Sequence, residues 1–215
     1  MIPTILFDID GTLLSFPGVG RRAMERAMEE VWRIPRALER VSFAGTTDGL
    51  VARQVGGARP RAALWARYLE HLERMVAELD APAPHDGVAA LLDELARRGA
   101  RLGLLTGNLR PGAVIKLRAA GLLGSFDFAV SAFAEDGDLR EEVAAAARRR
   151  CDGAPVAVVG DTAADVACAR HIGARALAVL TGAHEEAELA AAGPDLLVKD
   201  LTATRALADW LLAPR

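Results

Sequence analysis

The sequence has little of what disulfide scaffolds, zinc sites and membrane spans are built from. It contains two cysteines, Cys151 and Cys168, and no Cys-x-x-Cys pair, which excludes a disulfide scaffold and a structural zinc site. It holds no run of about 20 apolar residues, so we expect no transmembrane helix. Residues 1–4 carry no basic side chain ahead of the first apolar run, unlike a secretory signal. These absences predict a cytoplasmic protein.

The sequence also lacks an excess of charge of one sign. Its 26 Lys and Arg residues nearly balance its 29 Asp and Glu residues, for a formal net charge of −3. Without a global basic field, we expect neither nucleic acid nor a membrane as a partner. Lysine is scarce, because Lys116 and Lys199 are the two lysines and the other cationic side chains are arginine. The four histidines share no spacing that predicts a metal site.

What is present is an alternation of strand and helix patterns. A buried strand over residues 2–7 is followed by helical spacing over residues 20–33 and 61–80, where an apolar stripe with Trp65 and Tyr68 is expected to be packing core. Prolines in residues 80–84 mark a linker. Beyond it we expect strands at 101–105, 126–130, 155–159, 176–180 and 196–198, and helices at 88–95, 113–120, 141–150, 165–172, 185–192 and 204–212.

This alternation predicts an α/β fold, a three-layer Rossmann-like core in which helices cover both faces of a parallel sheet. The core would comprise residues 1–14 and 83–215. Residues 15–82 would form an α-helical insert after the first strand. The 215 residues, 52% of them hydrophobic, can bury about 70% of the unfolded surface without a disulfide or a structural metal.

Polar residues follow three of the expected strands. They are Asp8-Ile9-Asp10-Gly11-Thr12, Thr106-Gly107-Asn108, and Gly160-Asp161-Thr162 with Asp165. Ligands of such sheets bind beyond the carboxyl ends of the strands, so these segments are expected to converge on one site. Each also has an ordinary explanation, such as an Asp-Gly turn or a helix N-cap at Asp161 or Thr162. Their joint occurrence at strand ends favours a site.

The acidic residues of these segments indicate metal-assisted chemistry. Asp8 and Asp10 are two residues apart on an extended chain and so point the same way. Together with Asp161 they would repel one another unless a cation neutralises them, and oxygen ligands suit Mg²⁺. An aspartate beside such an ion can act as a nucleophile, and a second can act as general acid and base.

The remaining residues of these segments suit a phosphate group. Gly11 allows a sharp turn beneath a ligand. Thr106 offers a hydroxyl, and Gly107 and Asn108 offer amides, to phosphate oxygens. With Thr12, which follows Gly11, these residues are the predicted phosphate-binding set.

These segments resemble the haloacid dehalogenase superfamily of hydrolases. The matching residues are 6–13, 104–108 and 159–165, and the insert is similar to the helical cap of the branch that contains phosphoglycolate phosphatases and β-phosphoglucomutases. Residues 116–122 and 167–174 are also similar to that branch. The dehalogenases of the superfamily lack the second aspartate, so Asp10 argues for phosphoryl chemistry.

The resemblance implies a role for each matching residue. Asp8 would be the nucleophile and a Mg²⁺ ligand, and Asp10 would be general acid and base, with its backbone carbonyl on the metal. Thr106 would hold the transferring phosphoryl group, with Asn108 beside it. Asp161 would bind Mg²⁺ through its carboxylate, and Asp165 would act on the metal through water.

One departure from the family pattern concerns a cation. The third family motif supplies a lysine between the second and fourth motifs, and neither lysine of this chain lies there. Lys116 is too close to the second motif and fits a surface position on a helix, while Lys199 lies beyond the fourth motif. The best substitute is Arg140, because a guanidinium can neutralise Asp8 and a phosphate oxygen. Arg140 could instead be a solvated residue near a helix start.

The sequence therefore predicts a Mg²⁺-dependent phosphatase that acts on a small phosphorylated metabolite, with phosphoglycolate as the first guess. Arg21 and the Gly45–Asp48 loop are candidates for substrate recognition, although they also fit a helix surface and a helix N-cap. The alternatives are a sugar-phosphate mutase, a phospho-accepting signalling module and a non-catalytic relative. The protein is expected to be a monomer or a homodimer.

Overall fold

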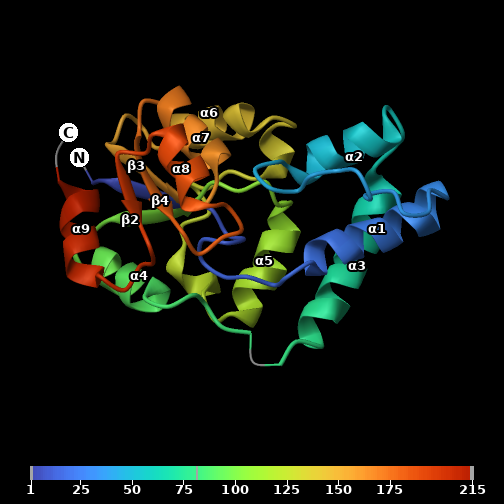
Figure 1. The fold of residues 1–215 in the computed structure, drawn as a ribbon, viewed down its shortest axis with the longest axis horizontal. Coiled ribbons are helices and arrows are strands. Elements are labelled where there is room, and N and C mark those ends of the chain that lie inside the picture. The colour runs from blue at the N-terminus through green and yellow to red at the C-terminus, as the bar shows by residue number, and fades with distance from the viewer. Residues whose placement is uncertain (1, 81, 214–215) are drawn as a thin grey trace.

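The computed structural model describes residues 2–80 and 82–213 and contains one parallel five-stranded sheet (Figure 1). The strands are β1 (Thr4–Phe7), β2 (Arg101–Leu104), β3 (Val156–Gly160), β4 (Arg175–Val179) and β5 (Leu196–Val198), in the order β2-β1-β3-β4-β5. Phe7 lies level with Leu104 on one side and Val159 on the other. The segments that follow these three residues therefore leave the sheet side by side.

Helices cover both faces of the sheet, because successive strand residues point to opposite sides. Leu6 and Val158 pack in an apolar cluster with helices α6 (Arg140–Arg150) and α7 (Ala163–His171). Ile5 and Phe7 pack in a second cluster with α4 (Val88–Arg97), α5 (Arg110–Ala119) and α9 (Thr204–Leu212). α8 (Glu186–Ala192) connects β4 to β5. The predicted α/β class with a three-layer core is confirmed.

The helical insert lies at one side of the sheet (Figure 1). It contains α1 (Val19–Trp32), α2 (Asp48–Gly56) and α3 (Ala62–Ala77), and α3 packs against both α1 and α5. The predicted stripe is buried at Leu64, Tyr68 and Leu72, within the same apolar cluster as Phe7. The division into two domains at residues 14/15 and 82/83 stays a prediction, and Ala81 of the expected linker lies outside the described residues.

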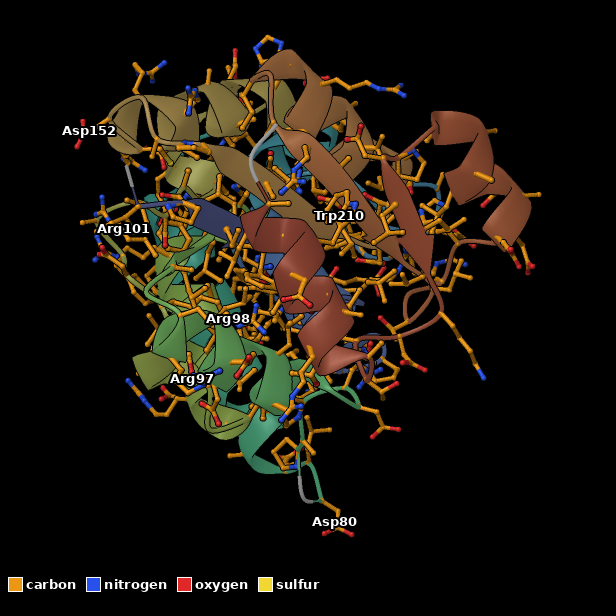
Figure 2. The ribbon with its side chains drawn as sticks, turned by 90° about the vertical axis from the view of Figure 1, so that its left-hand side faces the viewer. Asp80, Arg97, Arg98, Arg101, Asp152 and Trp210 are labelled. Atoms are coloured by element: carbon orange, nitrogen blue, oxygen red, sulfur yellow. The ribbon has the colours of Figure 1, made fainter. Side chains whose placement is uncertain are left out.

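The side of the molecule remote from the insert is held by ion pairs and one ring contact (Figure 2). Arg98, just after α4, lies 2.5 Å from Asp209 on α9. Arg101 lies 2.8 Å from Asp127. The guanidinium carbon of Arg175 lies 4.5 Å from the centre of the Trp210 ring. Each of these arginines has an acidic or aromatic neighbour, so they do not form an unpartnered basic patch.

The expected strand over residues 126–130 is wrong. The segment is a turn, in which the Asp127 carboxylate accepts a hydrogen bond from Ala129 N at 2.8 Å, so the side chain competes with a strand ladder. Phe126 instead packs edge-to-face on Phe7, with ring centres 6.1 Å apart. Ala132, a few residues later, takes the place beside β2 and donates from its N–H to Leu104 O at 2.8 Å.

The 3₁₀ turns are η1 (Leu123–Ser125) and η2 (Ala134–Asp136). α5 begins three residues earlier than expected, at Arg110, because Pro111 suits the first turn of a helix. Among the described helices, none is both long enough and apolar enough to cross a bilayer.

Candidate active site

A cavity of about 510 Å³ opens at the carboxyl ends of β1, β2 and β3, between the sheet and the insert. The sheet contributes Asp8, Asp10, Thr106 and Asp161 to its lining. The insert contributes the loop around Thr46. The three predicted strand ends therefore converge on one site, as the order of the strands requires.

Three carboxylates gather on the floor of this cavity. Asp8, Asp161 and Asp165 are buried, and an oxygen from each lies within 4.8 Å of the others. Burial and the neighbouring charge of Asp165 raise the pKa of Asp8 well above its ordinary value. The same two causes raise the pKa of Asp161 to about 7. Buried oxygens that oppose one another's ionisation fit a hard divalent cation such as Mg²⁺.

The Asp161 carboxylate is hydrogen-bonded to the loop that follows β1. Thr12 Oγ1 donates to Asp161 Oδ1 at 2.8 Å, and Thr181 Oγ1 donates to Gly11 O at 2.6 Å. Gly11 has a φ of +88°, and a Cβ added there would lie 2.2 Å from Asp161 Oδ2. A glycine is thus required at this turn. The Thr12 hydroxyl is committed to Asp161, and a phosphate-binding role for Thr12 stays a prediction.

Asp165 serves both as a helix cap and as a site residue. Thr162 is the N-cap of α7, where its hydroxyl accepts from Asp165 N, and Asp165 Oδ2 in turn accepts from Thr162 N at 3.1 Å. Asp165 Oδ1 faces the site and pairs with Arg140. The N-cap interpretation of this segment is confirmed. The same residues line the cavity, and their functional role stays a prediction.

Arg140, the first residue of α6, lies against the carboxylates. Its Nη1 lies 3.3 Å from Asp8 Oδ1, and its Nη2 pairs with Asp165 and donates to Leu105 O at 3.3 Å. Burial lowers the pKa of Arg140, but the charges of Asp165 and Asp8 outweigh it and raise that pKa above its ordinary value. Arg140 is 7% exposed, so the alternative of a solvated residue is wrong.

Lys116 is buried, and its expected surface position is wrong. It is 4% exposed rather than at the surface, and its Nζ lies 2.7 and 2.6 Å from the two carboxylate oxygens of Asp10. It shares the buried face of α5 with Gly112, Ala113 and Leu117. That spacing could have revealed the burial of Lys116, because a lysine that falls in the apolar stripe of a helix is directed inward. The helix also follows directly on a polar strand end, which provides acceptors. The expectation of a surface position rested on the closeness of Lys116 to the second motif.

Asn108 joins the second strand end to the first. Its Nδ2 donates to Asp10 Oδ2 and to Thr106 Oγ1, each at 2.8 Å, and its Oδ1 accepts from Lys116 at 2.7 Å. Thr106, Asn108, Asp10 and Lys116 therefore form one connected network along the cavity. The predicted proximity of Thr106 and Asn108 to the acidic residues is observed.

The Gly45–Asp48 loop of the insert closes on the second strand end. Asp48 N donates to Gly107 O at 2.8 Å, and Asp48 Oδ2 accepts from Leu109 N at 2.9 Å. A Cβ added to Gly107 would lie 1.9 Å from Thr46 O, so a glycine is needed for this approach. Thr47 is the N-cap of α2, as the alternative for this segment predicted.

Tyr68 and Arg21 are two further side chains of the insert that line the cavity, beside Asp48. Burial raises the pKa of Asp48 to about 6, and burial together with the Asp48 charge raises the pKa of Tyr68. Tyr68 belongs to the packing stripe and was missed as a lining residue, because its spacing alone indicates core. Arg21 also lines the cavity, but its guanidinium donates to Leu38 O and, at 3.0 Å, to Val41 O.

A parallel sheet whose carboxyl edge carries clustered carboxylates beneath a helical insert defines a haloacid dehalogenase-like hydrolase. The profile of that family matches residues 2–173, and the chain belongs to it. The predicted family and hydrolase class are confirmed.

Curated relatives support the same assignment. The chain is 30% identical over 199 residues to a phosphoglycolate phosphatase of Synechococcus elongatus, covering 91% of this chain and 92% of the relative. It is 28% identical over 224 residues to the probable phosphatase IndB of Dickeya dadantii, covering 99% of this chain and 96% of the relative. The expected likeness to this branch of the family is confirmed.

Solved structures share the fold over nearly the whole chain. CbbY from Rhodobacter sphaeroides, in complex with phosphate, superposes with a TM-score of 0.75 at 24% identity, over 94% of this chain and 96% of that one. A putative β-phosphoglucomutase from Thermotoga maritima gives a TM-score of 0.66 at 22% identity, over 97% and 99%. At these identities the likeness shows the fold.

Proposed function

We propose that the protein is a Mg²⁺-dependent phosphatase that hydrolyses a small organic phosphomonoester through an aspartyl-phosphate on Asp8. The observation that carries the proposal is the surroundings of Asp8. Its carboxylate is buried, lies 3.3 Å from the Arg140 guanidinium, and shares the cavity floor with Asp161 and Asp165. A nucleophilic carboxylate beside a fixed cation and a metal-binding acidic cluster suits attack on an anionic phosphate.

In the first step, a carboxylate oxygen of Asp8 attacks phosphorus and the bond from phosphorus to the ester oxygen breaks. The leaving oxygen takes a proton from the Asp10 carboxyl, which lines the same cavity. The alcohol departs and the phosphoryl group remains on Asp8. Arg140 neutralises charge beside Asp8, and Thr106 and the amides of Gly107 and Asn108 would hold phosphoryl oxygens.

In the second step, the Asp10 carboxylate removes a proton from water and the oxygen of that water attacks phosphorus. The bond from phosphorus to Asp8 breaks, which releases inorganic phosphate and restores the Asp8 carboxylate. Asp10 thus ends the cycle carrying the proton that it needs for the next leaving group.

The residues that would hold Mg²⁺ are Asp8 and Asp161, with the backbone carbonyl of Asp10, and Asp165 would act through water. When bound, the ion supplies positive charge that offsets repulsion between the phosphate and the acidic residues.

The position of the insert favours a small substrate. Its Gly45–Asp48 loop closes over Gly107 and leaves a cavity of about 510 Å³. We assign residues 15–82 as a cap domain over a core of residues 1–14 and 83–215, with Arg21 and the Gly45–Asp48 loop near the substrate. The Synechococcus elongatus relative makes phosphoglycolate the first substrate to test.

The proposal is tested by phosphate release from a panel of phosphomonoesters that includes phosphoglycolate and several sugar phosphates, in Mg²⁺ and again in EDTA. We expect release in Mg²⁺ that is concentrated on a small substrate and absent in EDTA. Release that is equal with and without the metal contradicts the proposal. Isomerisation of a sugar monophosphate that requires a bisphosphate, without net release, identifies a mutase instead.

A further inference from the structure

We propose that Lys116 is a positioning residue that holds the Asp10 carboxylate in the orientation needed for proton transfer. The inference rests on the proposed function, since it assigns to Lys116 a part in the same reaction. Lys116 is neither on a strand end nor in an acidic loop, and it reaches the site from the second turn of α5. Its Nζ meets both oxygens of Asp10.

The hydrogen bonds of Lys116 are all directed to protein groups. An ammonium has three N–H donors, and three oxygens lie within 2.7 Å of Nζ, namely both Asp10 oxygens and Asn108 Oδ1. With its donors used in this way, Lys116 has none left for a substrate anion. This arrangement distinguishes it from Arg140, whose guanidinium lies against Asp8, the proposed nucleophile.

Lys116 and Asn108 fix the orientation of the Asp10 side chain through hydrogen bonds. The Asp10 side chain is 44% exposed, whereas the Lys116 side chain is 5% exposed and sits within the buried face of α5. Asn108 Nδ2 adds a bond to Asp10 Oδ2, which closes a ring of three side chains. A half-exposed carboxylate is thus fixed by a buried lysine, as a proton-transfer group requires.

The test uses the dependence of the rate on the leaving group. An alkyl alcohol leaves slowly unless its oxygen is protonated, whereas nitrophenolate leaves without a proton. Loss of Asp10 positioning therefore slows the hydrolysis of an alkyl phosphate much more than the hydrolysis of p-nitrophenyl phosphate. For Lys116→Met we expect kcat/KM in saturating Mg²⁺ to fall about 10- to 100-fold for the alkyl substrate and less than about 3-fold for the aryl one. A loss of equal size on both substrates overturns the proposal, because a merely structural ion pair does not sense the leaving group.

A double-mutant cycle with Asp10 separates positioning from other effects. In the Asp10→Asn background we expect Lys116→Met to cost less than about 2-fold further on the alkyl substrate. If the effects of Lys116→Met and Asp10→Asn on kcat/KM are fully additive, the proposal is overturned. Arg118→Met, an exposed change on the same helix, is the matched control and should alter neither substrate.

Lys116→Arg is the second variant, in case the methionine variant does not fold. It keeps the charge but changes the donor geometry. We expect a smaller loss with the same preference for the alkyl substrate, and a loss without that preference overturns the proposal. If the wild-type protein releases phosphate from neither substrate, the proposed function itself fails, and this result is distinct from an unselective variant of an active enzyme.

Discussion

At the scale of single residues, buried charges and their partners define the site. Asp8 carries a pKa raised by burial and by Asp165, so in the absence of a cation its charge is a cost to the folded protein. We expect Asp8→Asn to lower phosphate release by about 10³-fold or more, because the amide is a poor nucleophile. The melting temperature should not fall, since an uncharged side chain of the same shape replaces a buried carboxyl. Phosphate release and thermal unfolding check both outcomes, and substantial remaining activity would refute the nucleophile assignment.

Arg140 is the buried cation that neutralises Asp8 and Asp165. Arg140→Ala leaves these carboxylates unpaired, so we expect a loss of about 3–5 kcal/mol in the free energy of unfolding and a large loss of rate. Arg140→Lys should retain part of the stability and part of the rate, because it keeps the positive charge. It should not retain all of either, because one ammonium cannot reproduce the contacts of the guanidinium fork. Denaturant unfolding and kcat measure these effects, with the exposed Arg149→Ala on the same helix as the control.

Arg140→Ala should also lower kcat far more than Lys116→Ala does. The reverse order would move the third-motif role away from Arg140.

The acidic residues could be predicted from the sequence because they stand at strand ends, where the fold brings them together. Arg140 could be proposed because the family pattern supplies a cation between the second and fourth motifs, and Arg140 stands there just before an expected helix. Lys116 was misplaced for a physical reason. The burial of its ammonium depends on acceptors from Asn108 and from Asp10, and Asp10 is distant in the sequence. A lysine without such acceptors belongs on the surface.

At the scale of elements, the insert is tied to the loop that precedes Arg140. Asp138 lies 3.1 Å from Arg53 on α2 and 3.1 Å from Arg61 at the start of α3, and its carbonyl accepts from Thr47 Oγ1 at 2.6 Å. Two residues later Arg140 begins α6 and contacts Asp8. Closure of the insert and the placement of Arg140 therefore share one short segment.

We expect Asp138→Ala to loosen the closed insert, and thus to raise KM severalfold with a smaller fall in kcat, because substrate binding depends on closure. Steady-state kinetics on the preferred phosphomonoester measure the two constants. Asp209→Ala removes a comparable surface ion pair at the far end of the sheet and should change neither. An unchanged KM in Asp138→Ala would show that this contact does not govern closure.

Elements with a clear burial pattern were predicted well, and those decided by local side chains were not. The parallel strands are apolar on both faces, so their runs stand out in the sequence. Residues 126–130 have similar composition, but the Asp127 turn and the packing of Phe126 on Phe7 remove them from the sheet. α2 could be anticipated only from a possible N-cap near Thr47 and was given no bounds, because its apolar face is short.

At the scale of the whole molecule, the acidic cluster links stability to pH and to metal. A carboxyl whose pKa is raised on folding destabilises the folded state only when it is ionised. For Asp161, with a pKa of about 7, this cost is absent below about pH 4 and complete above about pH 7. This group therefore lowers stability as the pH rises, and Asp8, whose pKa is also raised, acts in the same direction.

We expect Mg²⁺ to raise the melting temperature more at about pH 8 than at about pH 5, because at low pH protons already neutralise the cluster. Thermal unfolding in EDTA and in Mg²⁺ at the two pH values measures this difference. Asp161→Asn should reduce the Mg²⁺ effect at high pH. A Mg²⁺ effect of equal size at both pH values would contradict a role for these carboxylates in metal binding.

In the proposed reaction the phosphoryl group passes through Asp8. The direct measurement is acid quenching of the enzyme during turnover of a radiolabelled aryl phosphate in Mg²⁺, with the Asp10→Asn variant used to slow hydrolysis of the phosphoenzyme. We expect a hydroxylamine-labile label on the peptide that contains Asp8, and none in Asp8→Asn. A label on another residue, or turnover by Asp8→Asn at the wild-type rate, would contradict it.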